Sequence, residues 1–267
     1  MKGVSKYPRI IPCAIYAPNR IISQVAITAE NVPGALAKVA SKMAEHKVNI
    51  LSGLIMAEPD MASGTLTMFL DLTDADVDLS KLLKELRALN VVLKAEVVTK
   101  KIGDMAVDGT THATTFLGGR VVVLDVNDIS AMLGWLIRTF YSGGRAIIFD
   151  MGKRVGASAA KKFKSSYELR GRELVETFLA LQAAAGWFDY EVVSFDEGGP
   201  ELDIRLYENF ECLPLKGKSD KPVSNFVRGA LAGVVGEAFE RDFSVNEVRC
   251  LAVGDPYCEF VVKPKPE

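Results

Sequence analysis

Histidine, cysteine and tryptophan are scarce in this chain. Two histidines and four cysteines among 267 residues leave little material for acid–base or nucleophilic catalysis, because imidazole is the side chain that ordinarily titrates near neutral pH. A Ser-His-Asp order, the glycine fingerprint of a dinucleotide site and the Lys-Ser/Thr end of a phosphate loop are all missing from the sequence. We therefore expect a protein that is not an enzyme.

Charge of one sign and long apolar runs are also missing. The chain has 32 basic and 34 acidic residues without a basic run, whereas nucleic-acid binding depends on clustered cations that neutralise phosphates. Apolar runs such as "RVVVLDV" and "RAIIFDM" are far shorter than the roughly 20 residues that cross a bilayer. The first residues lack the features of a secretory signal. We expect a cytoplasmic protein that binds neither nucleic acid nor membrane.

The composition that is present, 49% hydrophobic and 25% charged, is typical of globular proteins, and the length suits two domains. Periodicity predicts the order β-α-β-β-α-β over residues 20–100, with a turn at "ENVPG" before the first helix. Such a chain packs as an antiparallel sheet with both helices on one face, which is a ferredoxin-like α+β fold. Residues 1–19 would be an extension, and the polar stretch 101–114 a linker.

The first helix and the strand after it carry a family motif, "ENVPGALAKVASKMAEHKVNIL", which resembles the ACT domain, a regulatory amino-acid-binding module. The resemblance implies that ligand-binding residues of this domain are Asn31, Pro33, Gly34, Ala35 and Asn49. A helix N-terminus offers free N–H groups to a carboxylate, and a glycine there allows close approach. The alternative is that Asn31 only caps the helix, that Gly34 only makes the turn and that the domain only dimerises. The family often has Asp in place of Asn31.

Residues 115–267 predict a second domain that mixes helices with antiparallel hairpins. Its expected elements are a strand at "RVVVLDV", a helix ending at Gly143–Gly144, a strand at "RAIIFDM", two helices broken near Ser165–Ser166, and a hairpin across "EGGP". A helix from "KPVSNFV" and a final hairpin follow. Three glycines within that helix, at 229, 233 and 236, lower its propensity and indicate that another backbone or a bound molecule lies against it.

The last fifth of the chain carries the most specific motif. "GALAG", "EVRC" and "GDPYCEF" together resemble the 4-vinyl reductase (4VR, V4R) domain, whose relatives include small-molecule sensors of bacterial aromatic-responsive regulators. The resemblance implies an α/β fold with hairpins packed on helices, and a pocket for a hydrophobic or aromatic molecule. Trp187, Tyr190 and Phe226 are our candidates for its lining, because they lie on the flanking elements. The alternative is that these aromatic residues only fill the core.

The same resemblance implies a metal site. In zinc-binding members of the family, the counterparts of Glu247, Cys250 and Cys258 are ligands, together with a cysteine where this chain has Ser224. Serine is a poor zinc ligand, so we expect Cys212 to complete a closed, structural set of Cys212, Glu247, Cys250 and Cys258. Because residues three apart on a flat strand point to opposite faces, Glu247 and Cys250 converge only across a bulge or twist. Reduced buried thiols and a disulfide are the alternatives.

These inferences combine into a regulatory protein. We expect a homodimeric sensor whose V4R-like domain binds a small hydrophobic molecule and whose ACT-like domain binds an amino-acid effector or dimerises. One alternative is a reductase-type enzyme, or an accessory to one, that acts on a vinyl or hydrocarbon substrate. The other is a scaffold that dimerises without a ligand.

Overall fold

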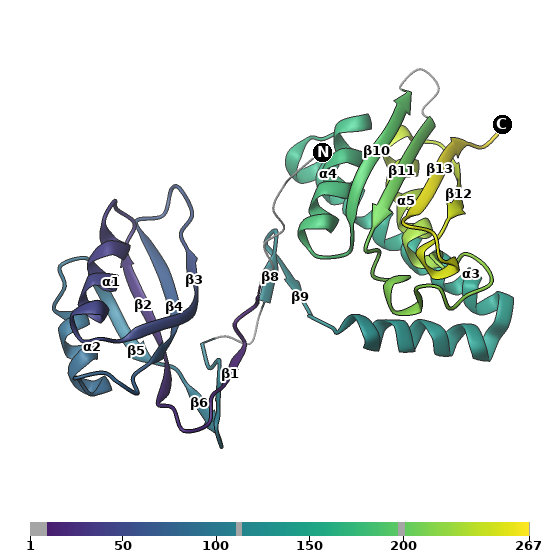
Figure 1. Cartoon of the computed structure of the whole chain (residues 1–267). Helices are drawn as coiled ribbons and strands as arrows, with labels where there is room; N and C mark the ends of the chain where they lie inside the picture. The colour runs from purple at the N-terminus through teal and green to yellow at the C-terminus, as the bar shows by residue number, and fades with distance from the viewer. Residues whose placement is uncertain (1–9, 111–113, 197–200, 267) are drawn as a thin grey trace. The chain divides into compact units, whose positions relative to one another are not determined.

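The computed structural model describes residues 10–110, 114–196 and 201–266. The chain forms two compact units, one within residues 3–122 and one within 123–267 (Figure 1). Each unit has its own hydrophobic core. The two are described separately below.

The first unit is built on a four-stranded antiparallel sheet in the order β3-β4-β2-β5. Its elements are β2 (Ile22–Glu30), α1 (Ala35–Glu45), β3 (Asn49–Met56), β4 (Ser63–Asp71), α2 (Leu79–Arg87) and β5 (Val92–Val97). One core contains alternate residues of β2, Val25 and Ile27, together with Met43 of α1 and Leu82 of α2. Both helices therefore cover the same face, and the predicted ferredoxin-like fold is confirmed (Figure 1).

The stretches before and after this fold pair with each other. β1 (Ala14–Tyr16), β7 (Met105–Val107) and β6 (Lys100–Ile102) form a small antiparallel sheet, in which Ala14 lies opposite Val107. Ala106 is buried against Ile22 and Phe69. A hairpin of β8 (Thr114–Phe116) and β9 (Gly119–Val121) follows. The strand that we expected at "RVVVLDV" is wrong beyond Val121, because the next four residues have no regular structure before a helix begins at Val126.

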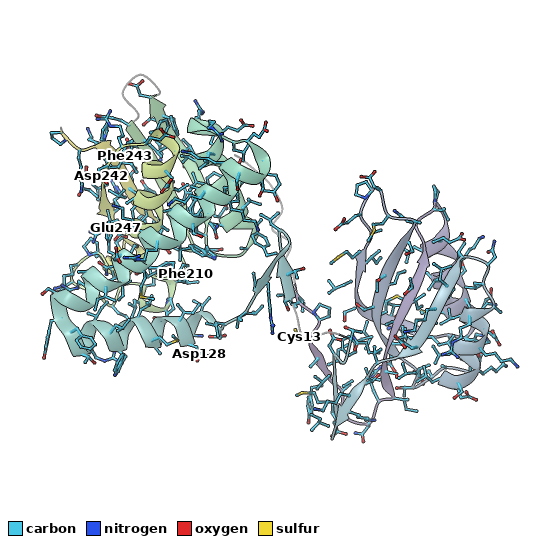
Figure 2. The ribbon with its side chains drawn as sticks, turned by 180° about the vertical axis from the view of Figure 1, so that it is seen from behind. Cys13, Asp128, Phe210, Asp242, Phe243 and Glu247 are labelled. Carbon is cyan, nitrogen blue, oxygen red and sulfur yellow. The ribbon has the colours of Figure 1, made fainter. Side chains whose placement is uncertain are left out.

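The second unit packs helices against a sheet of order β10-β11-β13-β12. Its elements are α3 (Val126–Tyr167), α4 (Gly171–Ala184), β10 (Asp189–Asp196), β11 (Glu201–Tyr207), α5 (Asn225–Phe239), β12 (Phe243–Arg249) and β13 (Cys258–Pro264). All three strand pairings are antiparallel. Buried side chains such as Phe210 and Phe243 belong to one core between the sheet and the helices (Figure 2).

The strand that we expected at "RAIIFDM" is wrong, because those residues, 145–151, lie within α3. The backbone of α3 leaves helical geometry at Tyr141 (φ 51°, ψ −118°) and then continues as a helix to Tyr167. Its buried positions Gly144, Ile148, Gly152, Gly156 and Ala160 recur every four residues, which is the spacing of a buried helix face. A short apolar run cannot distinguish a strand from a buried helix by itself.

That helix face meets α5 backbone to backbone. A Cβ atom added at Gly152 or Gly156 would lie 2.0 Å from a carbonyl oxygen of α5, and one added at Gly229 or Gly233 would lie 2.1 Å from a carbonyl oxygen of α3. These four glycines, which we call the glycine seam, therefore permit a contact that no other residue type allows. The expectation that a backbone lies against α5 is confirmed at Gly229 and Gly233.

Among the residues that the structure describes, none of the helices combines the length and the apolar character that crossing a membrane requires.

Candidate metal centre

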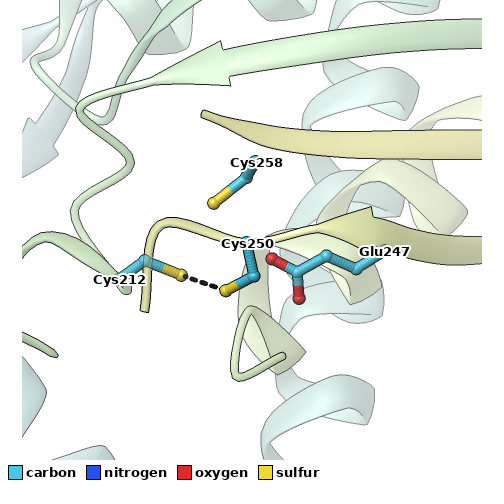
Figure 3. Close-up of side chains that lie close together, drawn as sticks. All are labelled: Cys212, Glu247, Cys250 and Cys258. Carbon is cyan, nitrogen blue, oxygen red and sulfur yellow. Dashed lines mark hydrogen bonds between the residues drawn. The ribbon is translucent and has the colours of Figure 1, made fainter. Parts of the chain in front are cut away.

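A loop and the final hairpin bring the candidate ligands of the second unit together. Cys212 precedes a 3₁₀ turn at Leu213–Leu215, Glu247 lies on β12, Cys250 follows that strand, and Cys258 begins β13. One ligand atom from each residue lies within 4.8 Å of the others (Figure 3). The three cysteines are buried. Segments about 40 residues apart in sequence thus supply one compact cluster of three sulfurs and a carboxylate.

A bulge and a tight turn aim these side chains at one another. The register of β12 against β13 shifts between Glu247 and Arg249, so the bulge that convergence requires is confirmed. The Cys250 N–H then donates to the Asp255 carboxylate at 2.8 Å, and Gly254 adopts a left-handed φ of 113°. This turn returns the chain to Cys258, whose sulfur accepts the Leu251 N–H at 3.4 Å.

Ser224, the residue that we expected not to be a metal ligand, lies inside the cluster and holds Glu247. Its hydroxyl donates to Oε1 of Glu247 at 2.6 Å, and its backbone N–H donates to Oε2 at 3.1 Å. The same hydroxyl lies 2.9 Å from the Cys212 sulfur. Both carboxylate oxygens are therefore fixed by one buried residue at the start of α5.

Two buried residues beside Cys212 also shape the cluster, and sequence reasoning missed both. The Asn209 amide donates to the Ser224 hydroxyl at 3.0 Å. The Glu211 carboxylate accepts the Phe226 and Val227 N–H groups at 2.9 and 3.0 Å, so it caps α5 in place of Ser224. In the sequence, the only feature that could have pointed to these two residues is their position close to Cys212, in "ENFEC".

Burial governs the charges at this centre. Desolvation raises the pKa of Glu247 to about 8 and that of Glu211 to about 7, against the hydrogen bonds that each carboxylate accepts. Hydrogen bonds from Cys212 and Cys258 lower the pKa of Cys250. Hydrogen bonding to Cys250 and Cys258, with burial, raises the pKa of Cys212. Hydrogen bonding among the three thiols therefore favours the thiolate form at Cys250 over that at Cys212, because it lowers the pKa of Cys250 and raises that of Cys212.

The donor set fits a zinc ion. Ligand sulfurs about 2.3 Å from a tetrahedral ion lie about 3.8 Å apart, and the Cys212 and Cys250 sulfurs are separated by 3.5 Å. That separation is too long for a disulfide bond of about 2.05 Å. Three thiolates and one carboxylate suit zinc in both softness and number. Four protein ligands would leave no position for a substrate, so such a site has a structural role.

Aromatic rings pack next to the segment that carries Cys212. The ring centroids of Trp187, Phe210 and Phe226 lie 5.4 to 6.1 Å from one another. We call these three the aromatic cluster. Trp187 and Phe226, two of the candidate lining residues, thus pack directly against each other. Phe210, which sequence reasoning missed, packs against both. Tyr190 is partly buried on β10 and pairs with Leu206 of β11.

In the first unit, the candidate ligand-binding residues fall at two ends of the sheet. Gly34 has a φ of 86° and precedes α1, which has no side-chain cap. Asn31 instead donates to the carbonyls of Glu58 and Met61 at 3.1 and 3.0 Å, so it holds the β3–β4 loop. Pro33 is exposed and Ala35 is buried at this turn.

Asn49 begins β3 at the opposite end of the sheet. It pairs with Asp71, whereas Glu30, just before the turn, pairs with Ser63. The two pairs lie eight residue steps apart along β4, a span of about 27 Å at 3.4 Å per residue. A single chain therefore does not bring Asn49 to the Asn31 turn.

Family models match a part of each unit. Residues 25–94 match the AHAS small subunit-like ACT domain, and residues 202–264 match the V4R domain. Among curated proteins, the chain is 28% identical over 123 residues to the uncharacterized protein MJ0150 of Methanocaldococcus jannaschii, covering 45% of this chain and 65% of that protein. It is 43% identical over 44 residues to the uncharacterized protein MJ1460 of the same organism, covering 16% and 27%. The match thus spans less than two thirds of either relative.

Similar solved structures include the phenol-responsive sensory domain of the transcription activator PoxR with phenol, at a TM-score of 0.49 and 19% identity, covering 56% of this chain and 79% of that one. A vinyl-4-reductase family protein from Methanocaldococcus jannaschii has a TM-score of 0.38 and 21% identity, covering 55% and 85%. The ACT domain of GTP pyrophosphokinase from Chlorobium tepidum has a TM-score of 0.25 and 16% identity, covering 29% and 97%.

Proposed function

We propose that this chain, which carries an ACT-like domain followed by a V4R domain, is a cytoplasmic small-molecule sensor with a non-catalytic, regulatory role. Its V4R domain binds a hydrophobic or aromatic molecule, and zinc holds the final hairpin in place. The observation that carries the proposal is the segment 209–212, where Phe210 of the aromatic cluster lies two residues from Cys212 of the candidate metal centre.

The aromatic cluster supports binding of an apolar guest. Its three rings come from the turn before β10, the loop after β11 and the first turn of α5, so a ligand that packs against them would touch both the sheet and a helix. Trp187 and Phe226 are only partly buried. Part of each of these two rings is therefore accessible to a ligand, and aromatic side chains are common in the lining of small-molecule sites.

Ligand binding is tested on the full chain by native mass spectrometry and tryptophan fluorescence, with phenol and palmitic acid as the two probes. Fluorescence of the protein should change on titration with at least one probe. Trp187→Phe should abolish that change, whereas Trp135→Phe, a control at an exposed position on α3, should keep it. A purified protein that carries no small molecule and responds to neither probe would contradict the sensor proposal.

The ACT-like domain supports a role for a second copy of the chain. β3 is an edge strand, and its residues Leu54, Ile55 and Met56 are each at least half exposed. Antiparallel pairing of two β3 strands about a two-fold axis would place the partner's Asn49 beside the Asn31–Gly34 turn. We propose that this dimer forms the amino-acid site. Within one chain, Asn49 and the Asn31 turn are about 27 Å apart, at about 3.4 Å per residue along the strand, and a second copy would bring them together.

A further inference from the structure

The Asn209 side chain has one fixed orientation at the candidate metal centre. Its residue is fully buried, and its Oδ1 accepts the Glu211 N–H at 3.2 Å. Because an amide oxygen that accepts this bond faces the backbone, the NH₂ group must face the other way. Asn209 therefore presents hydrogen-bond donors, and no acceptor, to the cluster.

Those donors meet three acceptors. The Asn209 nitrogen lies 3.0 Å from the Ser224 hydroxyl, 3.6 Å from the Cys258 sulfur and 3.7 Å from the Cys212 sulfur. Ser224 in turn donates to Glu247 at 2.6 Å. One amide thus contacts two of the candidate sulfurs directly and orients the candidate carboxylate through one hydroxyl.

The net negative charge of the candidate ligands explains why hydrogen-bond donors are needed beside them. Three thiolates and a carboxylate carry four negative charges, and a zinc ion neutralises only two of them. Burial makes the remaining charge unfavourable unless N–H or O–H groups point at it. The Leu251 N–H donates to Cys258, and the Ser224 N–H and hydroxyl donate to Glu247. The Ser224 hydroxyl also lies 2.9 Å from the Cys212 sulfur and 3.8 Å from the Cys258 sulfur, but its single proton is shared with Glu247. The Asn209 amide therefore supplies N–H donors toward both Cys212 and Cys258.

We propose that Asn209 is a positioning residue of this centre: it raises the affinity for zinc by orienting the Cys212 and Cys258 sulfurs and by offsetting their negative charge, without touching the ion. The inference rests on the proposed zinc centre and adds to it a residue that binds no metal. Its geometric basis is the donor face of a fully buried amide between two sulfurs.

Asn209→Asp tests this role, because it keeps the shape of the side chain but replaces the donors with a carboxylate. Competition with a chromophoric chelator should show an affinity for zinc reduced about 10- to 100-fold. In cobalt-loaded protein, the thiolate-to-cobalt absorption bands should shift or weaken, which a loss of stability alone would not cause. Asn209→Ser removes the amide without adding charge. If Asn209→Asp does not fold, the zinc affinity and the cobalt spectrum of Asn209→Ser are compared with those of the wild type instead.

Asn225→Asp is the matched control. Asn225 is also buried, but its amide donates to the Val223 carbonyl at 3.0 Å and not to the cluster. Wild-type affinity and spectrum in Asn209→Asp would overturn the inference and leave the zinc centre intact. An equal loss in Asn225→Asp would assign the effect to the start of α5 and also overturn it. A wild-type chain that binds no zinc would instead refute the centre itself.

Discussion

Cys250 has a lowered pKa in the candidate metal centre, because hydrogen bonding with the neighbouring Cys212 and Cys258 thiols favours its thiolate form. Zinc binding requires the other ligands to lose their protons as well. The pKa of Glu247 is raised to about 8 by burial, so the affinity for zinc should rise with pH across the neutral range. At the scale of a residue, zinc binding at this centre therefore releases protons from its ligands.

We expect the purified full chain to hold one zinc ion after a chelator wash, and Cys250→Ala to hold none. Loss of an ion that is present at 1,000 times its dissociation constant lowers the free energy of unfolding by about 4 kcal/mol. Elemental analysis and thermal unfolding measure the two effects. Cys13→Ala, at an exposed cysteine in the other unit, should change neither. A zinc content near zero in the unmutated chain would contradict the prediction.

His46 should titrate above the usual imidazole pKa of 6.5. Its two ring nitrogens lie 2.7 Å from Glu85 and 3.1 Å from Asp76, and only a protonated ring donates to both. Hydrogen bonds to Glu85, then to Asp76, raise the pKa of His46. Because the pKa is raised in the folded state, the stabilisation is complete below pH 6.5 and is lost as the pH rises through the folded value.

Proton NMR titration of the imidazole signals measures this pKa, with His46→Gln identifying the signal. Glu85→Gln should lower the pKa toward 6.5. The stability difference between wild type and His46→Gln should be larger at pH 5.5 than at pH 9. An imidazole pKa at or below 6.5 would show that the two contacts do not persist in solution.

Sequence reasoning predicted some residues of the centre and missed others, for a physical reason. Cys250 and Cys258 lie on two sides of one short turn, so local hairpin geometry brings them together. Asn209 and Glu211 act on α5, which follows them by a loop of irregular structure. Their roles depend on the path of that loop, and side-chain periodicity carries no information about such a path.

At the scale of elements, local periodicity predicts the first unit well, whereas part of the second unit depends on long-range contacts. β2 and α1 have clear periods of two and of about 3.6 residues, and the whole βαββαβ order follows from such periods. In α3, the run "RAIIFDM" contains Ile147 and Ile148 and has the length of a strand. What makes it helical is its contact with α5 through the glycine seam, a long-range interaction that overrides local propensity.

The glycine seam predicts a large effect of a single methyl group. In Gly156→Ala, the new Cβ would lie 2.0 Å from the Ala230 carbonyl oxygen, so α3 and α5 must separate. Overpacking of this kind costs about 1–3 kcal/mol, which urea denaturation followed by circular dichroism measures. Gly143→Ala is the control, because its Cβ meets only the Phe140 Cβ at 3.9 Å. Equal stabilities of the two variants would mean that the helices are not in backbone contact.

At the scale of the whole molecule, the proposed sensor joins two kinds of site. The candidate metal centre and the aromatic cluster are complete within one chain, because the second unit supplies every residue. The Asn31 turn and Asn49 are separated by the length of a strand. In the proposed sensor, a hydrophobic guest would therefore need one chain, whereas an amino-acid effector would need two, and its binding would depend on the state of association.

That dependence makes a final prediction about association. Ile55→Asp puts a charge on the exposed edge strand β3, and a charge there opposes pairing with a second strand. Light scattering coupled to size exclusion should therefore show a dimer for the wild type and a monomer for Ile55→Asp. Leu93→Asp places the same charge on β5, the other edge of the sheet, and should remain dimeric. A dimer that survives Ile55→Asp, or one that Leu93→Asp also breaks, would exclude the β3 interface and the shared amino-acid site.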